Sequence, residues 1–513
     1  MPKNILLFMT DQQRADYVGY IPGGKAVMPT LDKIAGHAYF TCCQSTNPIC
    51  TPARTSLITG RYSRQIGTLT MSGDLYPQIP TFMQALRNAG YRSYGIGKYH
   101  YLQTAPWDVG RGNGMRQFDQ AGSMRDFGYD FVWESAGKQQ LVTSHCFYAE
   151  YLRVRGLLED VRDFYQRSGG GNGDTADHNY DQANPWPFSE EDYIDVVTAR
   201  VACDALRVHD ADTPFYMMVS FCGPHKPYDA PSRYLDMFPL EREDDFIPQD
   251  GTRTMTAEQK ETLYRQRRSA KAMLRLIDDQ MARVLDVLAQ RGMLDETMII
   301  FTSDHGDMLG DHFMIQKGCP WRAALNVPLA VSVPGLAPVG ECASPVELSD
   351  IAATILDYAG LDAHAALSRS WPAYNDVIPS RSLMPVLCGE KAAIRSFTYS
   401  ESDFTEERGP DATAQGIVQN RGGAGRSNAW QCITTAATKY IKYLGYGPEE
   451  RPVEEFYDLL HDPHERDNLI ADPQRREEIE QARLRVMYVL DHYPPAQKCW
   501  AGYAGKGWEE VRR

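Results

Sequence analysis

The sequence predicts an α/β protein, with a large mixed, mostly parallel sheet sandwiched by helices and a smaller C-terminal α+β subdomain. Apolar runs of strand length alternate with segments of helical spacing, as is typical of a sheet covered on both faces. The length of 513 residues favours more than one domain, or one large domain with an appendage. We therefore expect a main domain over residues 1–380 and the subdomain over 381–513.

Four apolar runs predict buried strands of the main sheet. They cover residues 1–10, 94–96, 215–221 and 298–301. The first and last runs are each followed by polar residues, which include Asp11 and Asp304 with His305. Ligands of such sheets bind at the carboxyl ends of the strands. These side chains are therefore the first indication of a shared site.

Two segments predict helices. Residues 80–89 have helical spacing and precede Gly90, and the longer segment 256–291 precedes Gly292. Glycine is the residue most often found just past a helix end, so both helices are expected to stop there.

The remaining segments predict loops and the C-terminal subdomain. Residues 101–190 are rich in Gly, Asp, Asn, Trp and Tyr, and we expect long loops there that shape a substrate pocket. A second irregular stretch spans about 362–382. Beyond it, strand-like runs at 430–433 and 440–443 and a charged helix near 473–492 predict a small antiparallel sheet with a helix.

Composition excludes several classes of partner. Hydrophobic residues make up 43% of the chain and charged residues 23%, which allows a large core. The net charge of -14 argues against a general binder of nucleic acid or of membrane surfaces, because both are anionic. The first apolar run is too short for a signal-peptide core or a membrane span, so the sequence as it stands predicts a cytoplasmic protein. The 11 cysteines form no zinc spacing, which favours free thiols in a reducing compartment.

The most specific motif is Cys50-Thr51-Pro52-Ala53-Arg54-Thr55-Ser56-Leu57-Ile58-Thr59-Gly60. It fits the pattern C-x-P-x-R-x-x-x-x-T-G, which resembles the signature of the sulfatase family. The segment is also compatible with a buried Cys in a loop before a helix. The pair Thr59-Gly60 makes a chance match to the full pattern much rarer.

The resemblance implies an unusual nucleophile. A maturation enzyme of the family would oxidise Cys50 to formylglycine, whose aldehyde hydrates to a geminal diol. One hydroxyl would attack the sulfur of the ester, and the other would then lose a proton to expel sulfate. Arg54, one helical turn downstream, would hold the diol.

A second segment, Gly90-Tyr91-Arg92-Ser93-Tyr94-Gly95-Ile96-Gly97-Lys98-Tyr99-His100, resembles the second signature of the same family. Lys98 would place a positive charge on the sulfate oxygens, and His100 would orient the diol. Taken alone, each residue is equally compatible with a solvated Lys and a His at the edge of the core.

Paired polar residues after two predicted strands resemble the metal ligands of the family. Asp11 with Gln12, and Asp304 with His305, would bind one divalent cation together with the residue derived from Cys50. Many sulfatases carry Asp-Asp and Asp-Asn at these pairs, and the Gln and His resemble choline sulfatases and phosphonate monoester hydrolases. The resemblance implies Ca²⁺ or Mn²⁺, with Mg²⁺ as a third candidate. Alternatively, Gln12 and His305 cap turns.

Two more residues complete the implied site. Gly223-Pro224-His225-Lys226-Pro227 resembles the family segment whose His contacts the bridging oxygen, and a His can protonate a leaving alkoxide near neutral pH. Lys317 follows Asp304-His305 at the usual family interval and would be a second cation on the sulfate.

The resemblance covers nearly the whole chain and implies the alkaline-phosphatase-like fold. It predicts a metal-dependent sulfuric ester hydrolase that acts on a sulfated small molecule or saccharide. A phosphonate monoester or phosphodiester hydrolase of the same fold is the alternative, and a non-catalytic binding protein is a third hypothesis that the complete set of site residues disfavours. The resemblance also implies a formylglycine-generating enzyme as a partner, while neither nucleic acid nor a membrane is expected. The sequence leaves the oligomeric state open.

Overall fold

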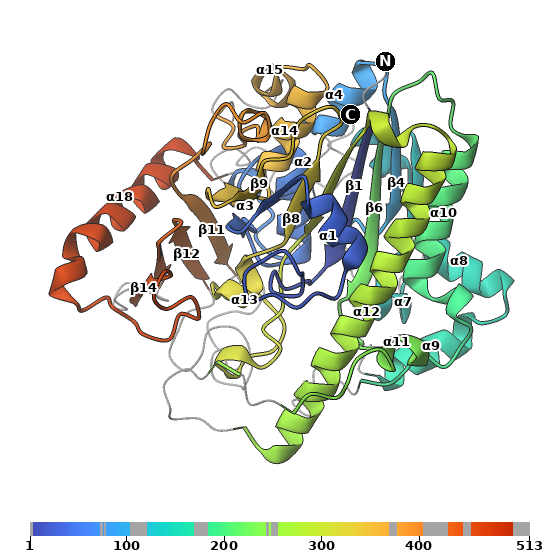
Figure 1. Cartoon of the computed structure of the whole chain (residues 1–513), viewed down its shortest axis with the longest axis horizontal. Coiled ribbons are helices and arrows are strands. Elements are labelled where there is room, and N and C mark those ends of the chain that lie inside the picture. Colours follow the sequence, from blue (N-terminus) through green and yellow to red (C-terminus); the bar gives the residue numbers. More distant parts are fainter. Residues whose placement is uncertain are drawn as a thin grey trace, which may run out of the picture.

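The computed structural model describes residues 4–71, 75, 78–102, 121–168, 183–242, 246–247, 255–368, 377–403, 429–444 and 453–495. Within them, an eight-stranded sheet lies between two layers of helices, and a four-stranded sheet with one long helix lies at its side (Figure 1).

The main sheet is mixed and mostly parallel, as the sequence predicts. Neighbours from β5 to β7 all run parallel, whereas β8 is antiparallel to both strands beside it. Across the sheet the order is β5 (Phe131–Glu134), β4 (Arg92–Gly97), β6 (Phe215–Pro224), β1 (Asn4–Asp11), β7 (Thr297–Ser303), β8 (Leu329–Ser332), β2 (Ala38–Phe40) and β9 (Gly340–Cys342).

The central strand β1 is buried along its whole length because it packs against helices on both faces. Leu6 and Phe8 belong to one hydrophobic core, and Ile5, Leu7 and Met9 belong to the other. This alternation follows from the two-residue period of a strand, and it explains why the sequence shows a continuous apolar run instead of an amphipathic one.

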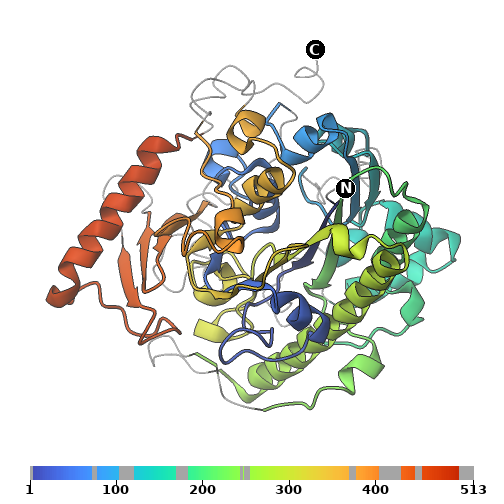
Figure 2. The same cartoon turned by 45° about the horizontal axis from the view of Figure 1, so that its top comes forward.

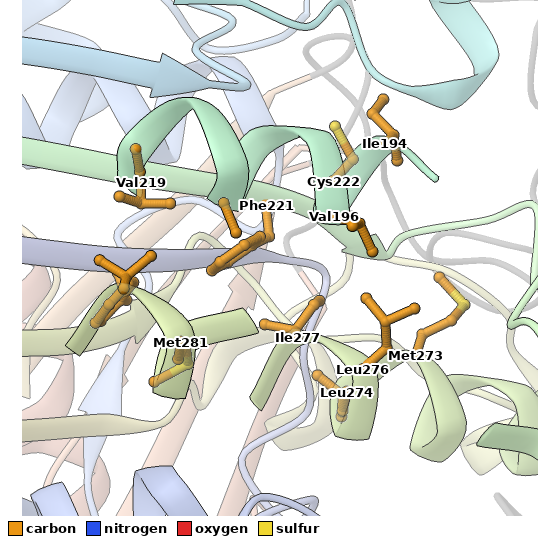
Figure 3. Close-up of a cluster of buried hydrophobic side chains, with 14 of the residues drawn as sticks. Ile194, Val196, Val219, Phe221, Cys222, Met273, Leu274, Leu276, Ile277 and Met281 are labelled. Atoms are coloured by element: carbon orange, nitrogen blue, oxygen red, sulfur yellow. The ribbon is translucent and has the colours of Figure 1, made fainter. Parts of the chain in front are cut away.

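One face of the sheet is covered by α1 (Pro29–Ala35), α10 (Ile194–Val208) and α12 (Ala257–Gln290), as Figure 2 also shows. Figure 3 shows side chains of α10, β6 and α12 that fill this core, among them Val196, Phe221 and Ile277. Helix α12 starts with a capping box at Thr256, whose hydroxyl accepts from the Gln259 amide.

The other face is covered by α2 (Cys50–Thr59), α4 (Phe82–Asn88) and α14 (Asp350–Tyr358). Helix α4 ends just before Gly90, whose φ of +90° is a conformation that glycine adopts without strain. Gly292 follows α12 in the same way with a φ of +69°. Both predicted helix ends are thus present.

The prediction of long loops over 101–190 is wrong for its central part. Residues 121–167 form one edge strand of the main sheet and four helices, namely β5, α6 (Ala121–Asp126), α7 (Lys138–Leu141), α8 (Phe147–Val154) and α9 (Leu158–Arg167). Helix α9 buries Leu158, Val161, Phe164 and Tyr165, a helical spacing that the composition of the whole range obscured. The glycine run at 169–174 lies outside the described residues. The irregular stretch 362–382 likewise contains α15 (Ala363–Leu367).

The C-terminal part contains a four-stranded antiparallel sheet and a long helix. The strands are β11 (Thr398–Asp403), β12 (Ala429–Thr434), β13 (Thr438–Tyr443) and β14 (Glu454–Asp458), and the helix is α18 (Arg476–His492). The sequence predicts β12, β13 and the helix but misses both edge strands. The domain boundary between 380 and 381 stays a prediction.

Several short elements connect these layers. They are β3 (Cys43–Gln44), which pairs with β10 (Val346–Glu347), and the helices α3 (Ser63–Ile66), α11 (Ser232–Leu235), α13 (Arg322–Leu325) and α16 (Met384–Leu387). The cysteines of the described residues are all unpaired. Among the same residues, no helix combines the length and the apolar character that a membrane span needs.

Candidate active site

Four adjacent strands end at one edge of the main sheet and bring distant residues together. The register pairs Thr10 of β1 with Ser303 of β7, so Asp11 and Asp304 follow at the same level. On the other side of β1, Gly97 of β4 pairs with Ser220 of β6, and Lys98 follows there.

The Asp304 carboxylate accepts three hydrogen bonds at this edge of the sheet. Its Oδ1 accepts from the backbone amides of Gln12 at 3.0 Å and of His305 at 2.9 Å, and its Oδ2 accepts from Arg54 Nε at 2.8 Å. The carboxylate therefore ties the ends of β1 and β7 to helix α2. Gln12 adopts a φ of +69°, which costs energy for a residue with a side chain.

His305 has one ring nitrogen available for a ligand. Its Nδ1 lies 3.0 Å from the carbonyl oxygen of Gly306, and because a carbonyl only accepts, Nδ1 carries the proton. The other ring nitrogen, Nε2, lies 3.2 Å from Cys50 Sγ, 3.8 Å from Asp11 Oδ1 and 3.6 Å from Asp304 Oδ1. A hydrogen bond that fixes the tautomer in this way is common around metal-binding histidines.

The donor atoms of Asp11, Cys50, Asp304 and His305 fit a cation site. One ligand atom from each residue lies within 4.8 Å of the other three, and all four residues are buried. Two carboxylates and an imidazole suit a divalent cation such as Mn²⁺ or Ca²⁺, which places compensating charge among the buried carboxylates.

Cys50 is the first residue of helix α2 and is only 2% exposed. Lys317 Nζ lies 3.2 Å and Lys98 Nζ lies 3.8 Å from its sulfur. Burial and the Asp11 carboxylate oppose ionisation of the thiol, but these cations outweigh them and hold the pKa of Cys50 well below its usual value. The position favours a negative charge at residue 50.

Lys98 also forms an ion pair with Asp11. Burial would raise the pKa of the Asp11 carboxyl, yet the surrounding cations, with Lys98 the strongest, hold it well below its usual range. Asp11 is therefore ionised at neutral pH.

Arg54 lies among the carboxylates, and its hydrogen bonds go to residues other than Cys50. Besides its bond to Asp304, its Nη1 donates to the Lys98 carbonyl at 2.7 Å and to Ser220 Oγ at 2.8 Å, and its Nη2 lies 3.7 Å from Asp11 Oδ2. In this structure Arg54 joins the carboxylates of Asp11 and Asp304 to the ends of β4 and β6.

His100 and His225 have their tautomers set by backbone carbonyls. Nε2 of His100 donates to the Ala136 carbonyl at 3.1 Å, and burial together with Lys98 lowers the pKa of His100, so the ring is neutral with Nδ1 unprotonated. Nδ1 of His225 donates to the Lys226 carbonyl at 2.8 Å, which leaves Nε2 to face a ligand. Burial and Lys317 hold the pKa of His225 well below its usual value.

All the residues that the sequence predicts for the site thus lie around one edge of the sheet. Sequence reasoning missed two side chains that contact them, Ser220 and Asp307, and a third, Tyr228, that contacts Asp307. Ser220 binds Arg54, Asp307 accepts from Gln12 Nε2 at 2.6 Å, and Tyr228 donates to Asp307 at 2.7 Å. Asp307 stands three residues after Asp304 in the printed sequence, but no spacing rule links it to Gln12, which is 295 residues away.

Comparison with known proteins gives one family. The model of the family described as Sulfatase matches residues 3–361. An arylsulfatase of Clostridium perfringens is 26% identical over 539 residues, with 100% of both chains covered. An N-acetylglucosamine-6-sulfatase of Bos taurus is 24% identical over 498 residues, which cover 89% of this chain and 78% of the relative.

The fold is shared with solved structures. A phosphonate monoester hydrolase of Agrobacterium radiobacter superposes with a TM-score of 0.71 at 22% identity, over 97% of both chains. At that identity the likeness concerns the fold alone. It agrees with the alkaline-phosphatase-like architecture that the sequence predicts.

Proposed function

The chain belongs to the sulfatase family and is a sulfuric ester hydrolase, and on that premise we propose that it releases sulfate at the cluster around Cys50. The observation that carries this proposal is the position of residue 50 at the start of α2, between two lysine ammonium groups and two buried aspartates. A sulfate monoester is an anion, and such an arrangement favours an anion whose charge shifts during bond cleavage.

We propose that Asp11, Asp304, His305 and the residue at position 50 hold one divalent cation, with Gln12 as a further ligand. The ion would supply Lewis-acid polarisation of an oxygen at this edge of the sheet. The buried, ionised state of Asp11 and the direction of the His305 Nε2 toward Cys50 and both aspartates support the set. The imidazole favours Mn²⁺, whereas the carboxylates suit Ca²⁺ as well as Mn²⁺.

We propose that a maturation enzyme converts Cys50 to formylglycine, whose hydrate supplies the nucleophilic hydroxyl. Lys98 and Lys317 then hold the sulfate oxygens, and the unprotonated Nδ1 of His100 accepts a proton beside residue 50. His225 would face the leaving group through Nε2, and it could deliver a proton there once the negative charge of the bound ester favours the protonated ring.

Replacement of Cys50 tests this assignment. In a host that contains a maturation enzyme, the peptide with residue 50 should show the mass of the aldehyde in place of the thiol. Cys50→Ala should lose nearly all turnover while its circular dichroism and melting temperature stay close to those of the wild type. Full activity of Cys50→Ala would refute the mechanism.

We further propose that the substrate is a sulfated saccharide. The support is the N-acetylglucosamine-6-sulfatase among the relatives. Rates on sulfated saccharides, choline sulfate and aryl sulfates separate the substrate classes. A clear preference for simple aryl sulfates would count against the saccharide.

Phosphonate monoesters remain the second candidate substrate because of the shared fold. The two lysines near Cys50 and the complete sulfatase signature favour sulfate esters. Matched aryl sulfate, phosphonate and phosphodiester substrates with one leaving group decide between them. We expect the highest kcat/KM for the sulfate.

A further inference from the structure

We propose that Asp307 fixes which end of the Gln12 carboxamide faces the cation site, and thereby makes Gln12 a ligand. The inference rests on the proposed metal site but not on the reaction performed there. It concerns a positioning residue, since Asp307 acts on the site only through Gln12.

The Asp307 carboxylate accepts three hydrogen bonds. Its Oδ2 accepts from Gln12 Nε2 at 2.6 Å and from the Tyr228 hydroxyl at 2.7 Å, and its Oδ1 accepts from the Leu309 amide at 3.2 Å. Asp307 is only 2% exposed, so solvent does not compete for these bonds. The carboxylate accepts in all three bonds, so the NH₂ end of the Gln12 carboxamide, and not its oxygen, faces Asp307.

The other end of the carboxamide then faces Cys50. Gln12 Oε1 accepts from Lys317 Nζ at 2.8 Å, and the same Nζ lies 3.2 Å from Cys50 Sγ. The Gln12 backbone is itself fixed, because its amide donates to Asp304 Oδ1 at 3.0 Å. The carbonyl oxygen, which is the only atom of the side chain that can bind a cation, thus points into the cluster.

A reversed Gln12 carboxamide would lose both its bond to Asp307 and its oxygen toward Lys317 and the cation site. Its NH₂ group would face the Lys317 ammonium and the cation, which are a donor and a positive charge. Its oxygen would face the Asp307 carboxylate, where two acceptors repel each other. Tyr228 does not decide the orientation, because its hydroxyl can rotate to donate or to accept.

The change Asp307→Asn creates a donor conflict without a change in size. In the native protein, Leu309 N–H donates to one oxygen of Asp307 and Gln12 Nε2 donates to the other. The new amide has only one oxygen, so it can accept only one of these two bonds. If the Leu309 bond is kept, the new NH₂ group faces Gln12 and forces its carboxamide to reverse. If the Gln12 bond is kept, the turn at Leu309 loses its acceptor.

The double variant Gln12→Glu/Asp307→Asn removes the conflict. A carboxylate at position 12 accepts from the new amide with one oxygen and presents the other to Lys317 and the cation. The total charge of the pair is the same as in the wild type. Recovery in this variant therefore separates an orienting role of Asp307 from a role of its charge or of its contribution to folding.

The test is calorimetric titration of EDTA-treated full-length protein with Mn²⁺, which needs no turnover. Asp307→Asn should weaken Mn²⁺ binding about 10- to 100-fold, as for other residues that orient a metal ligand. The double variant should return to within a few-fold of the wild type, and Tyr228→Phe should stay within a few-fold as well. Melting curves of each variant check the fold.

Two results would overturn the inference. One is unchanged Mn²⁺ affinity in Asp307→Asn, and the other is weak binding that the double variant does not restore although it is folded. No Mn²⁺ binding in the wild type would overturn it together with the proposed metal site. Normal Mn²⁺ binding without sulfate ester hydrolysis would count against the proposed function alone.

Discussion

Buried charges at the active site are held by partners on different elements of the fold. Arg54 on α2 bonds Asp304 after β7 and Ser220 in β6, and Lys98 after β4 pairs with Asp11 of β1. Removal of one member leaves its buried partner uncompensated, which costs several kcal/mol. Variants of these residues therefore have to be checked for folding before a loss of activity is assigned to chemistry.

The effect of His225→Ala should depend on the leaving group. Nε2 of His225 is the ring nitrogen that no backbone carbonyl engages, so it would deliver the proton once a bound ester anion favours the protonated ring, and only a poor leaving group needs that proton. We expect a loss of about 10²- to 10⁴-fold in kcat/KM on alkyl or sugar sulfates and a smaller loss on nitrophenyl sulfate. Steady-state rates on a leaving-group series measure this. Equal losses across the series would exclude the proton transfer.

Glu134 should make stability fall as pH rises. Burial raises the pKa of this carboxyl to about 8, and its Oε2 has no hydrogen-bond partner. Because the folded pKa lies above the unfolded value near 4.5, the folded state binds more protons between these two pH values. The contribution of Glu134 to the free energy of unfolding is therefore fully present below about pH 4.5. It decreases as the pH rises toward 8, by at most about 1.4 kcal/mol per pH unit.

The isosteric change Glu134→Gln removes this ionisation and should flatten the dependence. Urea unfolding of both proteins at several pH values between 5 and 8.5 measures the difference. The free energy of unfolding of the variant, relative to that of the wild type, should therefore increase as pH rises. Parallel curves for the two proteins would show that Glu134 does not ionise in this range.

At the scale of elements, the loop after β7 depends on the C-terminal sheet. Four non-glycine residues of this loop have positive φ values, which are Leu309, His312, Phe313 and Gln316. Such a backbone persists only where its surroundings hold it. Trp430 Nε1 of β12 donates to the Gly318 carbonyl at 3.2 Å, and Lys439 Nζ of β13 donates to the Pro320 carbonyl at 2.9 Å.

The loop carries Lys317, so a change in β13 should alter the position of Lys317 in the active site. Lys439→Met removes the bond to Pro320 and leaves the buried Glu465 carboxylate without its ion pair. We expect a loss of about 3–5 kcal/mol in the free energy of unfolding and weaker inhibition by inorganic sulfate. Urea unfolding and sulfate inhibition constants measure the two effects.

Lys442→Met serves as the control because Lys442 lies on the same strand and is partly exposed. It should leave both quantities nearly unchanged. Normal sulfate inhibition in a folded Lys439→Met protein would show that the C-terminal sheet does not position Lys317.

At the scale of the whole molecule, the site joins segments that are far apart in the chain. The donor residues come from the end of β1, the start of α2 and the end of β7, and a cation bound there would link all three. A ligand that binds only the folded state stabilises it by mass action, by about 2.7 kcal/mol at 100 times its Kd.

Added Mn²⁺ should therefore raise the melting temperature of the EDTA-treated protein. Asp304→Ala should melt at a temperature that does not respond to the ion, because it lacks a central ligand. Calorimetric melting with and without Mn²⁺ measures the shift. An equal rise in both proteins would place the ion at another site.

The sequence by itself determined the four adjacent strands β4, β6, β1 and β7 of the main sheet and the candidate residues that gather at their ends. The strands of residues 4–11 and 297–303 are evident because burial on both faces requires unbroken apolar runs. The site residues lie in motifs with local spacing, and position after a strand end predicts that Asp11 and Asp304 meet. Recognition of the family came from the same motifs.

The contacts between residues that are far apart in the sequence were decided only by the tertiary structure. The edge strands β11 and β14 are short and have mixed patterns, and they are evident only from their pairing with β12 and β13. The position of Arg54 among the carboxylates and the bond from Gln12 to Asp307 join residues more than 200 positions apart. No local pattern encodes such a contact, because the partner is chosen by the fold that brings the two segments together.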